Sequence, residues 1–237
     1  MTPESLTALI DGTWPAKSMN MVSGWTIREG GGAGSRVSAA SRNEQNAQIE
    51  DAEKAMRELR QPRLFMVRNG EDNLDADLAE RGYVIKDPVT LYSINADALA
   101  TQRPPAATCF EVWPPLATQA EIWEAGGIGN ERLAVMARAT GPKTAVLGRV
   151  HDTPAGTAFA AIYEGTAMLH AIETSVAFRR QGLGRNMIRA LAFWAQVRRA
   201  NAITLLVTKA NVGANALYSS LGMTPVGGYH YRIHSED

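Results

Sequence analysis

The spacing of apolar side chains along the chain changes between the two periods that distinguish helices from strands. Over residues 182–199 apolar positions recur every three or four residues, which predicts an amphipathic helix with one face in a core. Residues 203–207 form an unbroken aliphatic and β-branched run, which predicts a buried strand. Both patterns recur along the chain, so a mixed architecture of helices and strands is expected.

The second half of the chain is expected to alternate strands and helices. The polar segment 151–156 predicts a turn between two antiparallel strands. The predicted elements are strands at 108–112, 143–150, 157–163, 168–174 and 203–207, one or two helices over 117–139 broken near Gly126-Gly127, the helix at 182–199, a helix after Asn211 and a last segment at 228–232.

The first half has a mixed pattern of its own, and the stretch 102–107 predicts a linker between domains at 1–101 and 108–237. The glycine-rich stretch 30–34 lies between two strand-like segments with no helix behind it. A hairpin turn is therefore expected there rather than a phosphate-binding loop. The predicted elements are helices at 5–10, 47–60 and 73–81 and strands at 24–28, 63–68 and 83–95.

The most informative stretch is Arg179-Arg180-Gln181-Gly182-Leu183-Gly184, where a predicted strand passes through glycines into a predicted helix. The first N–H groups of a helix have no partner within it, and with the positive end of the helix dipole they form an anion site. Glycines let a phosphate approach the backbone closely. The stretch therefore predicts a pyrophosphate-binding loop, although glycine pairs at such turns also serve purely structural purposes.

The loop differs from two other phosphate motifs. A Walker loop needs Gly-x-x-x-x-Gly-Lys-Ser/Thr, which the chain lacks, and Arg185 and Met187 follow Gly184 where the dinucleotide fingerprint has its third glycine. The pattern Arg-x-x-Gly-x-Gly instead resembles the acyl-CoA-binding motif of the GNAT acetyltransferase superfamily.

A second block of residues strengthens this resemblance. GNAT proteins carry an Asn, an Ala, a Leu-Tyr and a Leu-Gly-Phe after their fifth strand. Behind the predicted strand at 203–207 this chain has them in the same order, with Met in place of Phe: Asn211, Ala214 or Ala216, Leu217-Tyr218 and Leu221-Gly222-Met223. Because two separate motifs occur in the right order and at a suitable distance, the second half is identified as a GNAT domain.

The resemblance implies that acetyl-CoA is the co-substrate. In the family the strand before the loop splays from its neighbour, so that its backbone groups pair with the pantetheine arm and the acetyl carbonyl. The loop would bind the pyrophosphate, with arginines nearby, and Asn211 either caps its helix or holds the CoA arm. The implied cofactor-binding residues are Thr174, Ser175, Val176, Arg179, Arg180, Gln181, Gly182, Leu183, Gly184, Arg185, Asn211 and Tyr218.

Tyr218 is the candidate general acid. Acetyl transfer to an amine passes through a tetrahedral intermediate, and a phenol can protonate the leaving CoA thiolate. A core tyrosine with a satisfied hydroxyl is the alternative. Glu173, on the strand before the loop, is the candidate general base, acting directly or through water. His170 on the same strand is a weaker candidate for the base, because a single histidine on an apolar strand is usually structural.

The resemblance extends over nearly the whole chain. Gly24-Trp25 and Arg28, the glycines, Arg36 and the terminal Tyr229-His230-Tyr231-Arg232 resemble a bacterial group of two-part GNAT proteins, in which the first half is degenerate and only the second binds acetyl-CoA. The implied fold is a tandem GNAT-like α/β (α+β) fold, a mixed and mostly antiparallel sheet flanked by helices in each half. Trp25, Arg28 and Arg36 either line an acceptor pocket between the halves or serve packing.

Composition narrows the class of partner. The formal net charge is zero, and no strong basic patch indicates a nucleic-acid partner. The single Cys109 excludes an intramolecular disulfide and suits a reducing compartment. No Cys/His cluster has metal-ligand spacing, and no apolar run predicts a membrane span or leader, so a cytoplasmic protein without a metal is expected.

These observations predict an N-acetyltransferase that moves acetyl from acetyl-CoA to a primary amine by direct attack. A non-catalytic acyl-CoA-binding or sensor module is the alternative, and an acyl donor larger than acetyl stays open. No acidic cluster indicates a polycationic acceptor, so a small amine or an amino acid is favoured. Both a monomer and a homodimer are compatible with the sequence.

Overall fold

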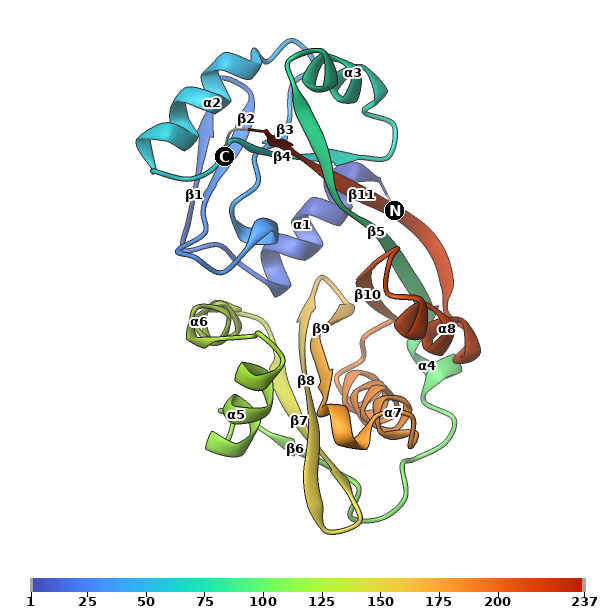
Figure 1. The fold of residues 1–237 in the computed structure, drawn as a ribbon. Helices are drawn as coiled ribbons and strands as arrows, with labels where there is room; N and C mark the ends of the chain where they lie inside the picture. The colour runs from blue at the N-terminus through green and yellow to red at the C-terminus, as the bar shows by residue number, and fades with distance from the viewer. Residues whose placement is uncertain (1, 236–237) are drawn as a thin grey trace.

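The computed structural model describes residues 2–235, in which one eight-stranded sheet runs through both halves of the chain (Figure 1). The strand order is β4-β11-β5-β10-β9-β8-β7-β6. The strands are β4 (Leu64–Arg68), β5 (Tyr83–Asn95), β6 (Cys109–Val112), β7 (Lys143–Val150), β8 (Thr153–Tyr163), β9 (Thr166–Thr174), β10 (Ala202–Thr208) and β11 (Thr224–His234).

Neighbouring strands of this sheet are antiparallel except β9 and β10, which are parallel. The mixed, mostly antiparallel sheet flanked by helices confirms the predicted fold class. One boundary was predicted wrongly. The turn expected at 151–156 is much tighter, because β8 already begins at Thr153 and His151 turns the chain with a φ of 52°.

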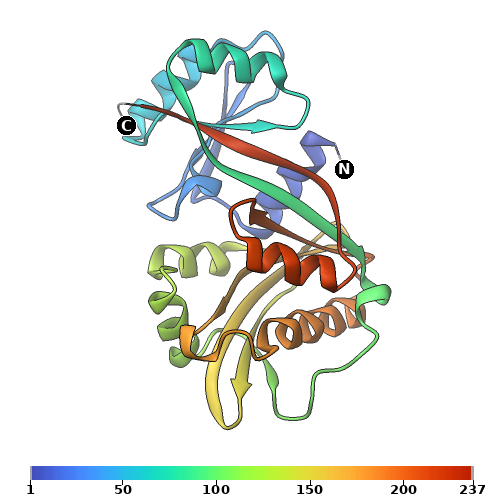
Figure 2. The ribbon, with the colours of Figure 1, turned by 45° about the vertical axis from the view of Figure 1, so that its right-hand side comes forward.

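The two halves exchange strands within this sheet. The end of β5, from the first half, pairs with β10 from Val89 to Asn95. The end of β11, from the second half, pairs with β4 from Tyr229 to Ile233. In Figure 2, β5 and β11 cross the molecule together as a two-stranded ribbon. Each half therefore contains a strand that the other half supplies, and the division at 102–107 into separate domains stays a prediction.

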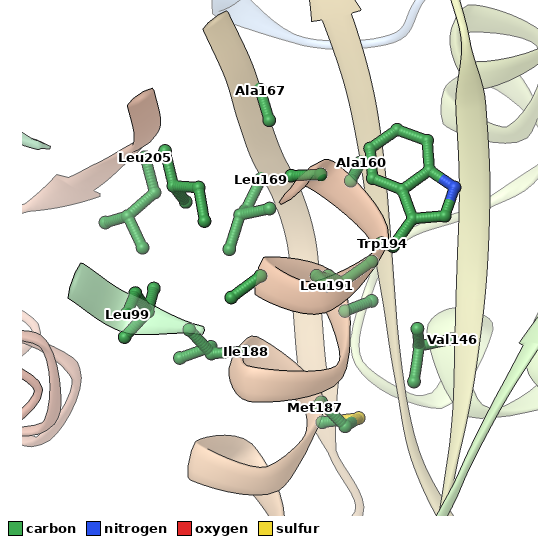
Figure 3. Close-up of a cluster of buried hydrophobic side chains, with 14 of the residues drawn as sticks. Leu99, Val146, Ala160, Ala167, Leu169, Met187, Ile188, Leu191, Trp194 and Leu205 are labelled. Atoms are coloured by element: carbon green, nitrogen blue, oxygen red, sulfur yellow. The ribbon is translucent and has the colours of Figure 1, made fainter. Parts of the chain in front are cut away.

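Helices cover both faces of the lower part of the sheet. The helix α7 (Leu183–Val197) packs on one face against Val146 and Ala160, whereas α5 (Ala117–Ala125) and α6 (Asn130–Arg138) pack on the other, against alternate residues such as Ala145 and Phe159. Figure 3 shows α7 directing Met187, Leu191 and Trp194 into the first of these cores. Trp194 is buried in this cluster and so serves packing, in line with the apolar face expected of the 182–199 helix.

The first half adds a smaller sheet and three helices above the second half. A three-stranded sheet has the order β1-β2-β3, and a parallel bridge between Ala40 and Phe65 connects it to β4. The sequence pattern did not predict β1, whose side chains are mostly exposed, Met19 and Met21 included. The elements are α1 (Pro3–Thr13), β1 (Ser18–Val22), β2 (Trp25–Glu29), β3 (Ser41–Arg42), α2 (Ile49–Glu58) and α3 (Asp72–Glu80), with the short α4 (Ala96–Leu99) after β5.

The glycine-rich stretch does not form the expected tight hairpin turn. Although β2 and β3 are antiparallel neighbours, residues 30–40 connect them as a long loop that includes a 3-10 turn at Ser35–Val37. The loop lies against α6, where Arg132 Nε donates to Ala33 O at 3.4 Å. The loop therefore reaches from the first half of the chain to a helix of the second half.

Three arginines fix the first half through bidentate ion pairs with carboxylates. Each guanidinium is largely buried, and each uses Nε and a terminal nitrogen on its carboxylate. The pairs are Arg28 with Asp11, Arg68 with Glu71, and Arg232 with Asp75.

Because the halves share one sheet, we predict that the protein unfolds in one cooperative transition. Met56→Ala, in a core of the first half, and Leu191→Ala, in the core under α7, should each cost about 2–5 kcal/mol. Differential scanning calorimetry should show both variants lowering the midpoint of the same transition. Val84→Ala, at an exposed position of β5, serves as the control with a change within about 0.5 kcal/mol. Two transitions, each responding to one variant, would contradict the prediction.

Candidate functional site

The two parallel strands at the centre of the sheet diverge. The ladder between β9 and β10 runs from Thr166 opposite Ala202 to Leu169 opposite Leu205 and then stops. Beyond that point β10 continues to Thr208 while paired with β5, and β9 continues to Thr174 while paired with β8. The backbone edges of β9 and β10 that face each other beyond Leu169 and Leu205 are therefore free of each other, as the splayed strand of the resemblance implies.

A β-bulge in β9 causes this divergence. Ala171 has a φ of 50°, which is unusual for a residue with a side chain, and the register with β8 shifts there. Trp123 of α5 donates from its indole Nε1 to Ala171 O at 2.7 Å, which fixes the bulge. The sequence gives little sign of it, because an alanine carries no preference for this conformation.

The bulge also changes which side chains share a face. His170 lies opposite Phe159 and Glu173 lies opposite Thr157, and these two partners are two residues apart on β8. Residues two apart on a strand point to the same face. His170 and Glu173 therefore lie on one face, although their spacing of three residues would place them on opposite faces of a regular strand. This is the face covered by α5 and α6, where Gln119 Nε2 donates to Thr157 Oγ1 at 3.1 Å.

The 179–184 loop leads directly into α7. Gly182 is the N-cap residue with a φ of 82°, no side chain caps the helix, and a Cβ on Gly182 would meet no atom within 4 Å. The first N–H groups of α7 therefore face open space at the positive end of the helix, which suits an anion. Gly184 has a different reason to be glycine, because a Cβ there would lie 3.3 Å from Leu217 of α8.

The loop side chains divide into exposed and buried ones. Arg180, with a φ of 67°, and Gln181 are exposed. Leu183 is buried in the core under α7. Arg185 Nη2 donates to Ser220 Oγ at 3.0 Å, which joins the start of α7 to the end of α8 (Val212–Ser220). Leu183 thus anchors the helix, while the polar residues around it stay accessible to a ligand.

Arg179 holds the end of β9. Its Nε donates to Thr174 O at 3.0 Å, and its Nη2 lies 3.1 Å from Glu173 Oε1. The N–H of Ser175 donates to Ala155 O of β8 at 2.9 Å. Val176, by contrast, is strongly exposed. Of the backbone groups expected to face a pantetheine arm, Thr174 C=O and Ser175 N–H thus have partners within the chain.

The helix α8 begins where β10 ends. Asn211 is its N-cap residue, and Asn211 Oδ1 accepts from Ala214 N at 3.0 Å, so the capping interaction expected of Asn211 is present. Tyr218 lies further along α8, is buried, and makes no hydrogen bond through its hydroxyl with residues 2–235. Burial raises the pKa of Tyr218 to about 12.

Tyr218 has a tyrosine neighbour that the sequence did not identify. The ring of Tyr92 on β5 lies 5.8 Å from the ring of Tyr218, and Tyr92 hydroxyl donates to Asn215 Oδ1 at 3.2 Å. Tyr92 belongs to the first half of the chain and reaches this place only because β5 crosses into the sheet of the second half. A pairing between such distant segments leaves no local sequence signal.

Glu173 keeps one free carboxylate oxygen. Oε1 accepts from Thr174 N and from Arg179, whereas Oε2 accepts no hydrogen bond from the described part of the chain. The carboxylate fits closely against the loop between α5 and α6, because a Cβ on Gly126 would lie 2.7 Å from Glu173 Cδ. The glycine at 126 thus permits the position of Glu173.

His170 is held in one tautomer by a chain of hydrogen bonds. Arg36 Nη1 lies 3.1 Å from His170 Nδ1, which must accept, and His170 Nε2 donates to Thr13 Oγ1 at 3.0 Å. Thr13 Oγ1 in turn donates to Leu9 O at 2.7 Å. Burial, and then the charge of Arg36, hold the pKa of His170 well below its usual value. Both ring nitrogens have partners, which favours the structural reading of this histidine.

The three candidate residues for an acceptor pocket have different environments. Trp25 is fully buried and donates to Gln48 O at 2.9 Å, and Arg28 is paired with Asp11, so both serve packing. Arg36 differs, because its guanidinium reaches His170 on β9 of the second half.

The first half also contains two chain segments in parallel pairing, but a side chain fills the space beside them. Ala40 and Phe65 form the parallel bridge there, and Arg68 Nη2 donates to Arg42 O at the end of β3. The same guanidinium is bound to Glu71 and to Thr7. A buried side chain thus fills the place where the second half has diverging strands, so the first half offers no comparable site.

Residues 2–235 lack two other kinds of feature, a metal-binding cluster and a membrane-spanning helix. No group of three or more His, Cys, Asp or Glu side chains in this range could hold a metal ion. Within the same range no helix has the length and apolar character to cross a membrane.

Comparisons with known proteins agree with this geometry. The model of the acetyltransferase (GNAT) family matches residues 105–223. The uncharacterized N-acetyltransferase YobR of Bacillus subtilis (strain 168) is 35% identical over 72 residues, which are 30% of this chain and 29% of that protein. The match thus spans less than a third of that relative.

Two solved structures share the fold over almost the whole chain. A GCN5-related N-acetyltransferase from Kribbella flavida has a TM-score of 0.71 at 20% identity, covering 98% of this chain and 95% of that chain. A functionally unknown conserved protein from Staphylococcus epidermidis ATCC 12228 has a TM-score of 0.70 at 15% identity, covering 98% and 96%. Since the family model spans half of the chain and the fold agrees, this protein belongs to the GNAT acetyltransferase family.

Proposed function

We propose that the protein transfers acetyl from acetyl-CoA to the primary amine of a small molecule or amino acid by direct attack. The observation that carries the proposal is the meeting of three features at one place: the diverging strands β9 and β10, the uncapped start of α7, and the hydroxyl of the largely buried Tyr218, which is unbonded within residues 2–235. The helices α7 and α8 touch here through Arg185 and Ser220.

The start of α7 suits the pyrophosphate of CoA. Backbone N–H groups at an open helix start bind phosphate oxygens, and the helix dipole favours their charge. Arg180 is exposed beside Gly182, and Arg185 and Arg189 are partly exposed on the first turns of α7. We infer that these arginines add positive charge around the phosphates, and that the gap between β9 and β10 takes the pantetheine arm.

Tyr218 is proposed as the general acid. A pKa of about 12 keeps its hydroxyl protonated over the whole physiological range, which an acid needs before transfer. A thiol has a reference pKa of about 8.5, so a free proton transfer from Tyr218 to a thiolate would be unfavourable. The transfer must therefore accompany the breaking of the carbon–sulfur bond, and water restores the proton of the hydroxyl after CoA has left.

Glu173 is proposed as the general base. Its Oε2 is free to accept a proton from the amine, directly or through water, while Oε1 is fixed by Thr174 N and Arg179. The bulge at Ala171 places this carboxylate on the face of the sheet opposite to α7, the face that α5, α6 and the 30–40 loop cover.

Tyr218→Phe should lower kcat about 100-fold or more, because general acid catalysis contributes about 10²–10⁴-fold. The dissociation constant of acetyl-CoA should stay the same, since the ring and its packing are kept. Thiol release gives kcat, and calorimetric titration gives the affinity. Tyr92→Phe is the matched control, which removes the neighbouring hydroxyl and should change kcat only slightly. Unchanged turnover in Tyr218→Phe would remove Tyr218 from this role.

Gly182→Asp should weaken acetyl-CoA binding about 100-fold. Two unit charges about 5 Å apart at an effective dielectric of about 20 repel by ~3 kcal/mol. Gly182→Asn is the matched control, because asparagine has the same shape without the charge and tolerates a positive φ. Calorimetry with acetyl-CoA should show a loss below about tenfold for the control. Equal losses in both variants would indicate backbone strain rather than a phosphate site.

Glu173→Gln should lower kcat at saturating acetyl-CoA by about 10²-fold or more, because the amide cannot accept the proton. Gly126→Ala tests the same residue without altering it, since the new Cβ would displace the carboxylate. A misplacement of about 1 Å can cost about 10²-fold. Steady-state kinetics with a panel of amines measures both variants. Full activity in Glu173→Gln would exclude this carboxylate as the base, and acetyl-CoA binding without any turnover in the wild type would favour an acyl-CoA-binding module instead.

A further inference from the structure

Arg36 carries a charge that no carboxylate in the described residues balances. Its guanidinium forms no ion pair within residues 2–235, and its Nε is buried without a hydrogen-bond partner. The three bidentate arginines of the fold behave differently, since Arg28, Arg68 and Arg232 each hold a carboxylate. Arg36 therefore differs from these three arginines in having no carboxylate partner among the described residues.

The neighbours of Arg36 are neutral. His170 Nδ1 accepts one of its N–H groups, so the imidazole is uncharged in this arrangement. Tyr229 and Tyr231 lie beside the guanidinium with their hydroxyls 3.0 Å apart. Burial raises the pKa of Tyr231 well above its usual value, so this hydroxyl does not supply a negative charge at neutral pH. A cation in such surroundings retains an unmet preference for an anion.

Arg36 is placed on the same side of the sheet as Glu173. Arg36 contacts His170, and His170 and Glu173 point to one face with a spacing of two strand positions, about 7 Å. Arg36 is half-buried as a residue, and its Nε is buried. One face of β9 thus presents a carboxylate with a free oxygen and, a short distance along the strand, a guanidinium whose Nε has no hydrogen-bond partner in the described part of the chain.

We propose that Arg36 binds a carboxylate of the acceptor, so that the acetylated amine belongs to a small amino acid or a related amino-carboxylate. The inference rests on the proposed acetyl transfer, because Glu173 is taken to meet the amine. An acceptor with both groups would place its amine at Glu173 and its carboxylate on Arg36. A guanidinium holds a carboxylate through two parallel hydrogen bonds, which selects such acceptors over simple amines.

The proposal also gives the first half of the chain a role in the reaction. The 30–40 loop carries Arg36, and Arg132 of α6 holds that loop at Ala33 O. Tyr229 and Tyr231 come from β11, the strand that passes into the first half. A degenerate half that binds no CoA would thereby supply the residue that selects the acceptor.

The first experiment compares matched acceptors with the full-length wild-type protein and acetyl-CoA. Each ω-amino acid from glycine to 6-aminohexanoate, and a set of α-amino acids, is paired with the amine that has hydrogen in place of the carboxylate. Thiol release should show a kcat/KM about 10- to 100-fold higher for the best amino-carboxylate than for its paired amine. Equal values across all pairs would overturn the proposal while leaving acetyl transfer intact.

The second experiment uses Arg36→Gln, whose amide can still donate to His170. This variant should raise KM for the amino-carboxylate about 10- to 100-fold and leave the paired amine almost unchanged. Arg36→Lys keeps the charge but loses the planar fork, so an intermediate loss is expected. Arg81→Gln, which loses an ion pair with Glu50 at the surface of the first half, is the control and should leave both acceptors unchanged. Equal losses for both acceptors in Arg36→Gln would overturn the proposal.

Thermal unfolding separates selection of the acceptor from a structural role. Arg28→Gln breaks a buried ion pair and should lower Tm by roughly 6–20 °C. Arg36→Gln removes a charge without a counter-ion, so its Tm should stay the same or rise. A fall as large as that of Arg28→Gln would show that Arg36 serves packing and would overturn the proposal.

Binding measurements distinguish a failure of the proposed acetyl transfer from a failure of the proposed carboxylate site. Amino-carboxylates titrated into the protein saturated with CoA should bind the wild type and lose affinity in Arg36→Gln. Binding that depends on Arg36 without any acetyl transfer would support the carboxylate site and reject the transferase function. An absence of acetyl-CoA binding would reject the proposed function alone, and an absence of amino-carboxylate binding would reject the site.

Discussion

A single hydrogen bond, from the indole of Trp123 to Ala171 O, fixes the conformation on which the candidate site depends. A residue with a side chain adopts a positive φ at a cost of order 1 kcal/mol or more, and this donor offsets part of it. The extra residue of the bulge separates β9 from β10 and brings Glu173 onto the face of His170. Without the bulge the ladder between the parallel strands would continue, and neither the gap nor the shared face would exist.

The exchanged strands β5 and β11 determine which segments cover the face of β9 that carries His170 and Glu173. Because β5 pairs with β10 and β11 pairs with β4, the first half cannot move far from β9 without breaking the sheet. The 30–40 loop is thereby held against α6, and its Arg36 contacts His170. Tyr92 lies beside Tyr218 for the same reason, because β5 carries it into the sheet of the second half. The first half is thus part of the environment of the site, even though its own parallel bridge is sealed by Arg68.

The features that the sequence predicted are those with local signals. Gly182 was recognisable because glycine at a helix start lets a phosphate approach the backbone, Asn211 because it suits an N-cap, and α7 because its apolar face repeats every three or four residues. The bulge could not be predicted, since Ala171 has no preference for a positive φ. The strand exchange depends on pairing between residues far apart in sequence, for which no local pattern exists.

The sequence argued against a phosphate-binding loop at residues 30–34, but it did not predict what this stretch contacts instead. A phosphate loop was excluded because no helix follows, and the structure instead has a long loop to α6. What decides the importance of Arg36 is the absence of a carboxylate partner within residues 2–235, and only the assembled fold shows which carboxylates are already paired with other arginines. An unpaired guanidinium lowers the stability of the free protein relative to a paired or apolar replacement. Such a residue is retained where a bound anion recovers the interaction, which is why the unpaired Arg36, rather than the well-paired Arg28, indicates what the acceptor carries.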